Sequence, residues 1–74
     1  MRDDAIALLE ILENGLTVML SNGGKFRVDP YDRYEASTWA IADDIEIDRT
    51  RDDVYNYTLL NINTDAWIRA TKLN

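Results

Sequence analysis

An Asn-Gly pair between two stretches of alternating side chains is the feature that most constrains how this chain can fold. Before the dipeptide Asn22-Gly23, the residues Leu16, Val18 and Leu20 alternate with Thr17, Met19 and Ser21. After it, Phe26 and Val28 alternate with Lys25, Arg27 and Asp29. A period of two places the two sets on opposite faces of a sheet. Because Asn and Gly accept the positive φ angles that tight hairpin turns require, this stretch predicts a β-hairpin.

The segment before this hairpin, residues 4–13, has two interpretations. Its apolar residues have helical spacing, Asp3 or Asp4 can cap a helix at its start, and Asn14-Gly15 can cap its end, which gives an α+β fold with an N-terminal helix. Alternatively, Ala7–Leu12 forms a strand that turns at Asn14-Gly15 into the hairpin. The second Asn-Gly turn favours this meander, because each strand then pairs with its sequence neighbour at little loop-closure cost.

The rest of the chain predicts further short strands with turns between them. Pro30 lacks an amide donor and ends the strand before it, so we expect residues 29–38 to form a loop. The further expected strands cover residues 39–47, 55–62 and 67–73. Trp39 and Trp67 are the expected anchors of the core. Short strands at regular spacing indicate an all-β fold, a small antiparallel meander or barrel of five or six strands in one domain, residues 1–74.

Several turns and aromatic residues follow one another in a definite order along the chain. They are Leu20-Ser21, Phe26-x-Val28-x-Pro30-x-Asp32, Trp39, Ala42-Asp43-Asp44-x-Glu46, Tyr57-x-Leu59-x-Asn61-x-Asn63-Thr64 and Arg69-Ala70. This order resembles a group of small bacterial proteins of unassigned function. The chain departs from the group at Gly24, where the group has Ser, and at Ala42, where it has Gly. The resemblance implies a barrel of the Src-homology-3-like class and a strand at Ala7–Leu12, and it contains no catalytic motif.

The composition excludes several kinds of chemistry. The 74 residues include no cysteine and no histidine, which removes disulfides, thiol nucleophiles, thiolate metal ligands and the usual general base. Adjacent carboxylates such as Asp43-Asp44 and Asp52-Asp53 point to opposite faces of an extended segment, and in turns they accept hydrogen bonds from nearby amides. The glycines at Gly23-Gly24 lead into a strand and not into the helix of a phosphate-binding loop. We therefore expect no enzymatic activity and no cofactor.

The charge of the chain limits its partners. A formal net charge of -6 at pH 7 opposes direct binding to nucleic acids and to anionic membrane surfaces, and it favours basic proteins or peptides. The N-terminal residues lack the basic region and long apolar run of a secretion signal. No apolar stretch approaches the roughly 20 residues that cross a bilayer. We expect a cytoplasmic protein.

Aromatic and acidic residues in the expected loops form the candidate site. Tyr31, Tyr34 and Tyr55 fall in or beside loops, where rings with a polar tip are enriched at contact surfaces, and Asp32 and Glu35 would border them. Such a surface suits a basic or proline-containing peptide, although packing in the core or in turns explains the same residues. Asp29, Asp32 and Glu35 follow one another at intervals of three residues and also offer oxygen ligands to calcium. This pattern lacks the spacing and central Gly of a helix-loop-helix calcium site, so we expect no metal.

Two functions follow from these features. The first is a non-enzymatic module that binds a protein or peptide through the tyrosines, or that forms a homo-oligomer along an unpaired strand edge. The second is a small acidic inhibitor of a phage-encoded kind, which occupies the basic nucleic-acid groove of a host protein. The second function predicts carboxylates lined up on one face at phosphate-like spacing and an inhibition that weakens steeply with salt.

Overall fold

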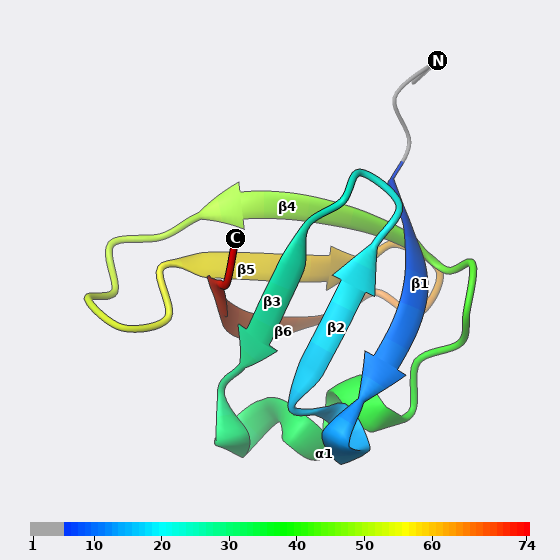
Figure 1. Ribbon diagram of the computed structural model, residues 1–74, viewed down its shortest axis with the longest axis horizontal. Helices are drawn as coiled ribbons and strands as arrows, with labels where there is room; N and C mark the ends of the chain where they lie inside the picture. Colours follow the sequence, from blue (N-terminus) through cyan, green and yellow to red (C-terminus); the bar gives the residue numbers. More distant parts are fainter. Residues whose placement is uncertain (1–5) are drawn as a thin grey trace.

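The computed structural model describes residues 6–74, which form a closed antiparallel barrel of six strands (Figure 1). The strands are β1 (Ile6–Leu12), β2 (Thr17–Leu20), β3 (Lys25–Val28), β4 (Asp44–Arg49), β5 (Tyr57–Asn61) and β6 (Ala66–Lys72). Around the barrel they follow the order β1-β2-β3-β6-β5-β4. The all-β prediction is confirmed, and the barrel is consistent with the small Src-homology-3-like class. The alternative N-terminal helix is wrong over residues 6–12, which form β1, and its first two residues lie outside the described part of the chain.

Two Asn-Gly turns connect the first three strands, as the sequence predicts. In the first turn, all residues of Glu13–Gly15 have a positive φ, which reaches 97° at Gly15. In the second turn, Gly23 has a φ of 90°, and the Oδ1 atom of Asn22 accepts a hydrogen bond of 2.8 Å from the amide of Gly24. The tight turns let neighbouring strands pair directly, so the meander is confirmed.

The connection between β3 and β4 is helical, so the prediction of a loop over residues 29–38 is wrong. A short 3-10 helix, Pro30–Asp32, leads directly into α1 (Arg33–Ser37). Proline suits the first helical position, and the side chain of Asp29 accepts a hydrogen bond of 3.0 Å from the amide of Tyr31. Figure 1 shows α1 below the barrel, under the ends of β1, β2 and β3. In the described residues, no helix is long and apolar enough to span a membrane.

The interior of the barrel holds one cluster of apolar side chains. Its buried members are Leu8, Val18, Leu20, Phe26, Val28, Ala36, Trp39, Ile45, Leu59, Ile68 and Ala70. Trp39 is only 4% exposed, which confirms it as an anchor of the core. Trp67 is 57% exposed, so its assignment to the core is wrong. Because Ile68 and Ala70 point inward, the period of two places Trp67 on the outer surface of β6.

β4 and β5 are shorter than the sequence predicts, whereas β6 has the predicted length and is shifted by one residue. The strand expected over residues 39–47 begins only at Asp44, because the chain turns before it: the amide of Ala40 donates a 2.9 Å hydrogen bond to Oδ2 of Asp43. The strand expected over residues 55–62 is limited to β5. Tyr55 and Ile62 therefore lie in the connections at either end of β5.

The last strand closes the barrel. β6 pairs with β5 along most of its length and with β3 through three residue pairs, while β1 pairs with β4. Beyond β6, the amide of Leu73 donates to the carbonyl of Lys25 at 2.8 Å. The side-chain amide of Asn74 donates to the carbonyl of Gly23, also at 2.8 Å. The C-terminal residues thus connect the end of β6 to the hairpin formed by β2 and β3.

Candidate functional site

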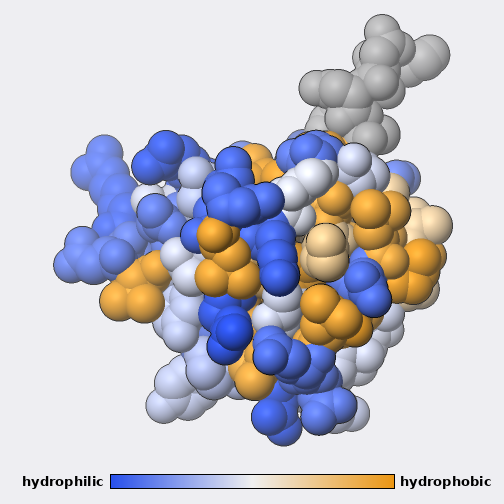
Figure 2. Space-filling model, viewed as in Figure 1, coloured by the Kyte–Doolittle hydropathy of each residue, from blue (hydrophilic) through white to orange (hydrophobic). Residues whose placement is uncertain are grey.

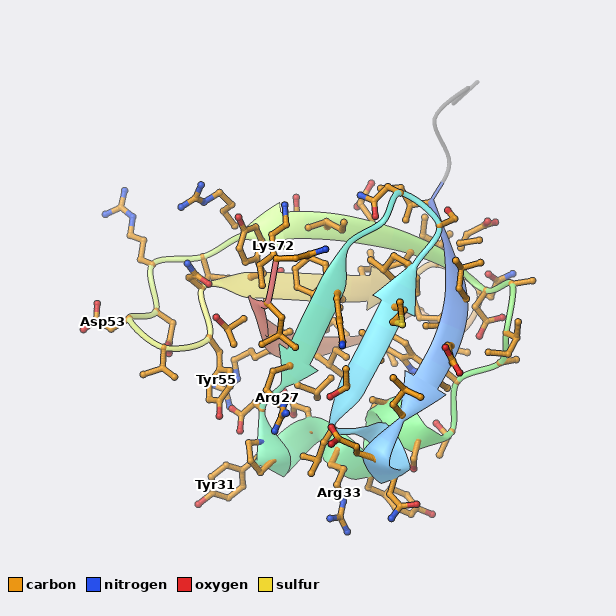
Figure 3. All side chains as sticks on the ribbon, viewed as in Figure 1. Arg27, Tyr31, Arg33, Asp53, Tyr55 and Lys72 are labelled. Atoms are coloured by element: carbon orange, nitrogen blue, oxygen red, sulfur yellow. The ribbon has the colours of Figure 1, made fainter. Side chains whose placement is uncertain are left out.

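The three tyrosines of the predicted site lie on separate segments. Tyr31, in the 3-10 helix, is 92% exposed, and Tyr34, in α1, is 82% exposed. Tyr55 is half-buried in the connection between β4 and β5. Figure 3 shows Tyr31 projecting away from the barrel, and Tyr55 in the same connection as Asp53. No ring-to-ring contact among the described residues joins these tyrosines.

The acidic residues predicted to border this site have intramolecular partners. Asp32 accepts a hydrogen bond of 2.8 Å from the amide of Arg69, and its Oδ2 atom lies 3.8 Å from Nε of Arg69. Asp29 lies 3.5 Å from the same guanidinium group. Glu35 accepts a hydrogen bond of 2.9 Å from the indole Nε1 of Trp39. These carboxylates hold the helical segment against β6 and the core. Within residues 6–74, no group of three or more carboxylates has an arrangement that could hold a metal ion.

An exposed tryptophan on the outer wall of β4, β5 and β6 is the functional candidate that the sequence interpretation missed. Trp67 pairs across the strands with Leu60. A shallow hollow of about 300 Å³ beside them is lined by Asp48 on β4, Thr58 and Leu60 on β5, and Trp67 on β6. We call these four residues the Trp67 surface. An exposed tryptophan beside an apolar side chain is typical of contact surfaces.

The register of the strands explains why these side chains point outward. Leu59 on β5 lies opposite Ile47 and Ile68, and all three contribute to the core. Their sequence neighbours Thr58, Leu60 and Trp67 must therefore lie on the outer side. A signal for this orientation exists in the sequence, because the polar residues Arg69 and Thr71 alternate with Ile68 and share the face of Trp67.

Carboxylates border the Trp67 surface on the side of β4. Asp44, Glu46 and Asp48 occupy alternate positions of this strand, with the buried Ile45 between the first two. Residues two apart in a strand project to the same face about 6.6–6.8 Å from each other. The outer wall of the barrel thus combines an indole ring with a row of acidic side chains.

The opposite wall has a hollow of similar size but of different chemistry. Its volume is about 310 Å³, and it is lined by Leu12, Glu13, Thr17, Lys25, Arg27 and Leu73. The hydroxyl of Thr17 donates to Glu13 at 2.6 Å, and the guanidinium of Arg27 lies 3.6 Å from the same carboxylate. Figure 2 shows apolar residues gathered over β1 and β2 on this wall, with hydrophilic residues over β3. The lining has two cationic side chains, Lys25 and Arg27, and one carboxylate, Glu13, so its charge does not favour a basic partner.

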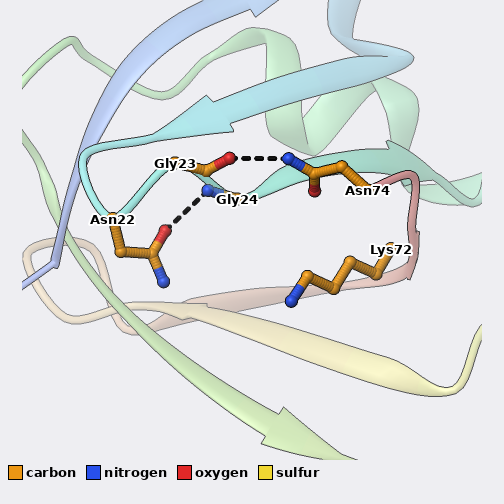
Figure 4. Close-up of a pocket in the computed structure, with 5 residues that line it drawn as sticks. All are labelled: Asn22, Gly23, Gly24, Lys72 and Asn74. Carbon is orange, nitrogen blue, oxygen red and sulfur yellow. Dashed lines mark hydrogen bonds between the residues drawn. The ribbon is translucent and has the colours of Figure 1, made fainter.

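A third hollow, of about 230 Å³, lies at the turn between β2 and β3 (Figure 4). It is lined by Asn22, Gly23, Gly24, Lys72 and Asn74. The amide of Gly24 donates to Asn22, and the carbonyl of Gly23 accepts from Asn74. These groups connect the turn to the C-terminal residues, and a strand follows the glycines. The interpretation of Gly23-Gly24 as a hairpin turn is therefore confirmed.

Comparisons with models of protein families, with curated proteins and with solved structures find no match to this chain. Its function is therefore inferred from its own residues and geometry.

Hydrogen bonds lower the pKa of two aspartates, Asp43 and Asp52, each of which lies in a turn. The side-chain amide of Asn61 donates to Asp43 at 2.8 Å and the amide of Ala40 donates at 2.9 Å, and these bonds lower the pKa of Asp43 below its usual value. The backbone amides of Tyr55 and Val54 lower the pKa of Asp52 in the same way. Each carboxylate accepts hydrogen bonds from nearby amides, as expected for aspartates in turns.

The substitution Asp43→Asn is expected to make the protein less sensitive to acid. A carboxylate whose pKa is lower in the folded than in the unfolded state adds stability above its unfolded value, 3.8, and loses that contribution as pH falls through the folded value. The amide oxygen of the variant can still accept both hydrogen bonds, but it does not titrate. Urea unfolding from about pH 6 to about pH 2 should therefore show a smaller loss of stability for D43N than for the unmodified protein. An equal loss in both proteins would contradict the role of Asp43.

Proposed function

We propose that this protein is a non-enzymatic module that binds a basic protein segment at the Trp67 surface. The observation that carries the proposal is the side chain of Trp67, 57% exposed, in a hollow that it shares with Leu60 and Asp48. An indole ring offers a large contact area, and its face attracts cations. Tryptophan is also enriched among the few residues that dominate the binding energy of protein interfaces. The nearby carboxylates favour lysine and arginine over acidic groups.

The geometry supports this surface better than the tyrosines. Tyr31 and Tyr34 are more exposed than Trp67, but their acidic neighbours Asp32 and Glu35 already have partners within the chain. A peptide site at the tyrosines stays a prediction. We do not propose a homo-oligomer along a strand edge, because each described strand pairs with two neighbours in the closed barrel.

A second candidate function, the small acidic inhibitor of a nucleic-acid-binding protein, is supported by the carboxylate row on β4. The separation of alternate residues, about 6.6–6.8 Å, is close to twice the roughly 3.4 Å rise per nucleotide along one DNA strand. Either function requires a basic protein partner, and we propose that the protein meets it in the cytoplasm, as a small bacterial protein of the kind that its sequence pattern resembles. Competition by duplex DNA for the same partner would distinguish the inhibitor from a general binding module.

Trp67→Ala is expected to weaken binding to selected peptides at least about ten-fold, because it removes the ring that provides most of the contact. The peptides would come from a random display library selected on the immobilised protein, and we expect sequences that combine lysine or arginine with an apolar residue. Affinities would be measured by fluorescence anisotropy. Because Trp67 lies outside the core, the variant should keep its melting temperature.

Tyr31→Ala is the matched control, since it also removes an exposed aromatic ring. It should leave the affinity for the same peptides unchanged. Unchanged affinity in W67A would contradict the proposal. A loss of affinity in Y31A alone would instead support the site predicted at the tyrosines.

A further inference from the structure

We infer that the hollow in the Trp67 surface holds a single cationic side chain of the partner, a lysine or an arginine, with its charge beside Asp48 and its hydrocarbon stem packed on Leu60 and Trp67. This inference rests on the proposed function and names the group that the site recognises. It follows from the strand positions of the residues that line the hollow, from its one carboxylate, and from the charges around it.

The spacing of the strands leaves room in the hollow for one long side chain. Its lining comes from three adjacent strands, with Asp48 on β4 at one side, Trp67 on β6 at the other, and Thr58 and Leu60 of β5 between them. Asp48 shares a row with Thr58, two residues along the strands from the row of Leu60 and Trp67. With strands about 4.8 Å apart and a rise of about 3.3 Å per residue, the backbones that carry the carboxylate and the indole are separated by roughly 12 Å. An alkyl stem packed on Leu60 at about 4 Å fits between them. Its terminal cation would then lie within reach of the carboxylate, while its stem contacts the apolar side chains.

The carboxylate of Asp48 is available to such a ligand. Asp48 is exposed, and none of the hydrogen bonds and ion pairs between residues 6–74 involves its side chain. A partner that covers the hollow removes water from this carboxylate. A neutral side chain would leave the charge without compensation, whereas a lysine or arginine would pair with it.

The nearest cationic residue on β6, Arg69, forms ion pairs with Asp29 and Asp32. Arg69 lies across β5 from Asp48, in the same row as Thr58. Its guanidinium is 3.5 Å from Asp29 and its Nε atom is 3.8 Å from Asp32, so its charge is balanced by the segment that leads into α1. Arg69 therefore neither neutralises Asp48 nor opposes a cation that enters the hollow.

The test uses two peptides that differ only in charge. Acetyl-Ala-Lys-Leu-Ala-amide and its norleucine counterpart would be titrated into the isotope-labelled protein, and the indole N–H signals would be followed by NMR. Trp39 provides an internal reference, because it is 4% exposed and its Nε1 atom already donates to Glu35. We expect the lysine peptide to move the Trp67 signal in a saturable manner without moving the Trp39 signal. The norleucine peptide should bind at least ten-fold more weakly.

Asp48→Asn should reduce the affinity for the lysine peptide to that of the norleucine peptide, and added salt should weaken only the lysine peptide. Asp53→Asn is the matched control: Asp53 is an exposed carboxylate in the connection between β4 and β5 (Figure 3), and its removal should change nothing. Equal binding of both peptides, or unchanged affinity in D48N, would overturn the inference and leave the proposed function standing if W67A still loses its selected peptides. No movement of the Trp67 signal with either peptide would also overturn it, while the display selection decides the proposed function independently.

Discussion

Replacing Gly15 with alanine is expected to destabilise the barrel by about 3 kcal/mol or more. Gly15 has a φ of 97°, which L-residues with a Cβ atom adopt at a cost of roughly 1–2 kcal/mol. A Cβ atom at this position would also lie 2.3 Å from the carbonyl oxygen of Arg33 and 3.0 Å from the amide of Ser37. Both atoms belong to the backbone of α1, so relief of the contact requires the whole helix to move. Urea unfolding followed by circular dichroism would measure the loss.

The substitution Gly23→Ala separates the cost of the positive φ angle from the cost of the contact with α1. Gly23 has a similar φ of 90°, but a Cβ atom there would have no heavy atom within 4 Å beyond its chain neighbours. Its substitution should therefore cost only about 1–2 kcal/mol. Equal losses in the two variants would show that the close approach of α1 to the first turn does not contribute.

Asn61→Leu is expected to cost about 2–4 kcal/mol, although leucine has a similar size and is more apolar. The side chain of Asn61 is fully buried at the end of β5. Its Nδ2 atom donates to Asp43 at 2.8 Å, and its Oδ1 atom accepts from the amides of Asn63 and Thr64 at 2.9 and 3.3 Å. Leucine removes all three bonds and leaves their partners without them. The loss would be measured by urea unfolding, and the acid sensitivity that depends on Asp43 should decrease as well.

The control for this prediction is Asn63→Ala. Asn63 is exposed, and its Oδ1 atom accepts one hydrogen bond of 2.7 Å from the amide of Asp44. Water can replace this bond, so we expect a loss of about 1 kcal/mol or less. A neutral or stabilising effect of N61L would mean that apolar burial outweighs the turn that Asn61 organises.

The strands and their turns were predictable because their signals are local. The dipeptides Asn14-Gly15 and Asn22-Gly23 determine two turns within a few residues, and alternation identifies the strands on either side. The choice between helix and strand for residues 6–12 is different. Helix propensity favours the wrong answer there, and the strand is stabilised by pairing with β2 and β4, the second of which lies far along the sequence.

The two tryptophans could not be distinguished by local signals in the sequence. Each lies in a run with other apolar residues, and residue type alone places both in the core. Trp39 is buried by the fold around it, whereas the register of β6 directs Ile68 inward and Trp67 outward. The helix α1 was missed for another reason, since its five residues are too few to establish a helical period.

The candidate site could not be assembled from the sequence. The aromatic and acidic residues around Asp32 in the sequence are typical of a binding loop. Its hydrogen-bond partner Arg69, however, lies 37 residues further along the chain. The Trp67 surface combines residues of three strands, and their proximity depends on the pairing register and not on spacing along the chain. The acidic side chains beside the Trp67 surface are nevertheless in keeping with the net charge of the chain, -6 at pH 7.

The position of β6 between β3 and β5 has a consequence for biosynthesis. During translation, β1 to β3 emerge first and can form their hairpins, but both β3 and β5 lack a neighbour until the residues from Ala66 onward have left the ribosome. Until then the nascent chain exposes Phe26 and Leu59, which the finished barrel buries completely or nearly so. Cooperative closure must therefore follow synthesis of the final strand, and a stalled or shortened product lacking β6 would be a target for chaperones and proteases.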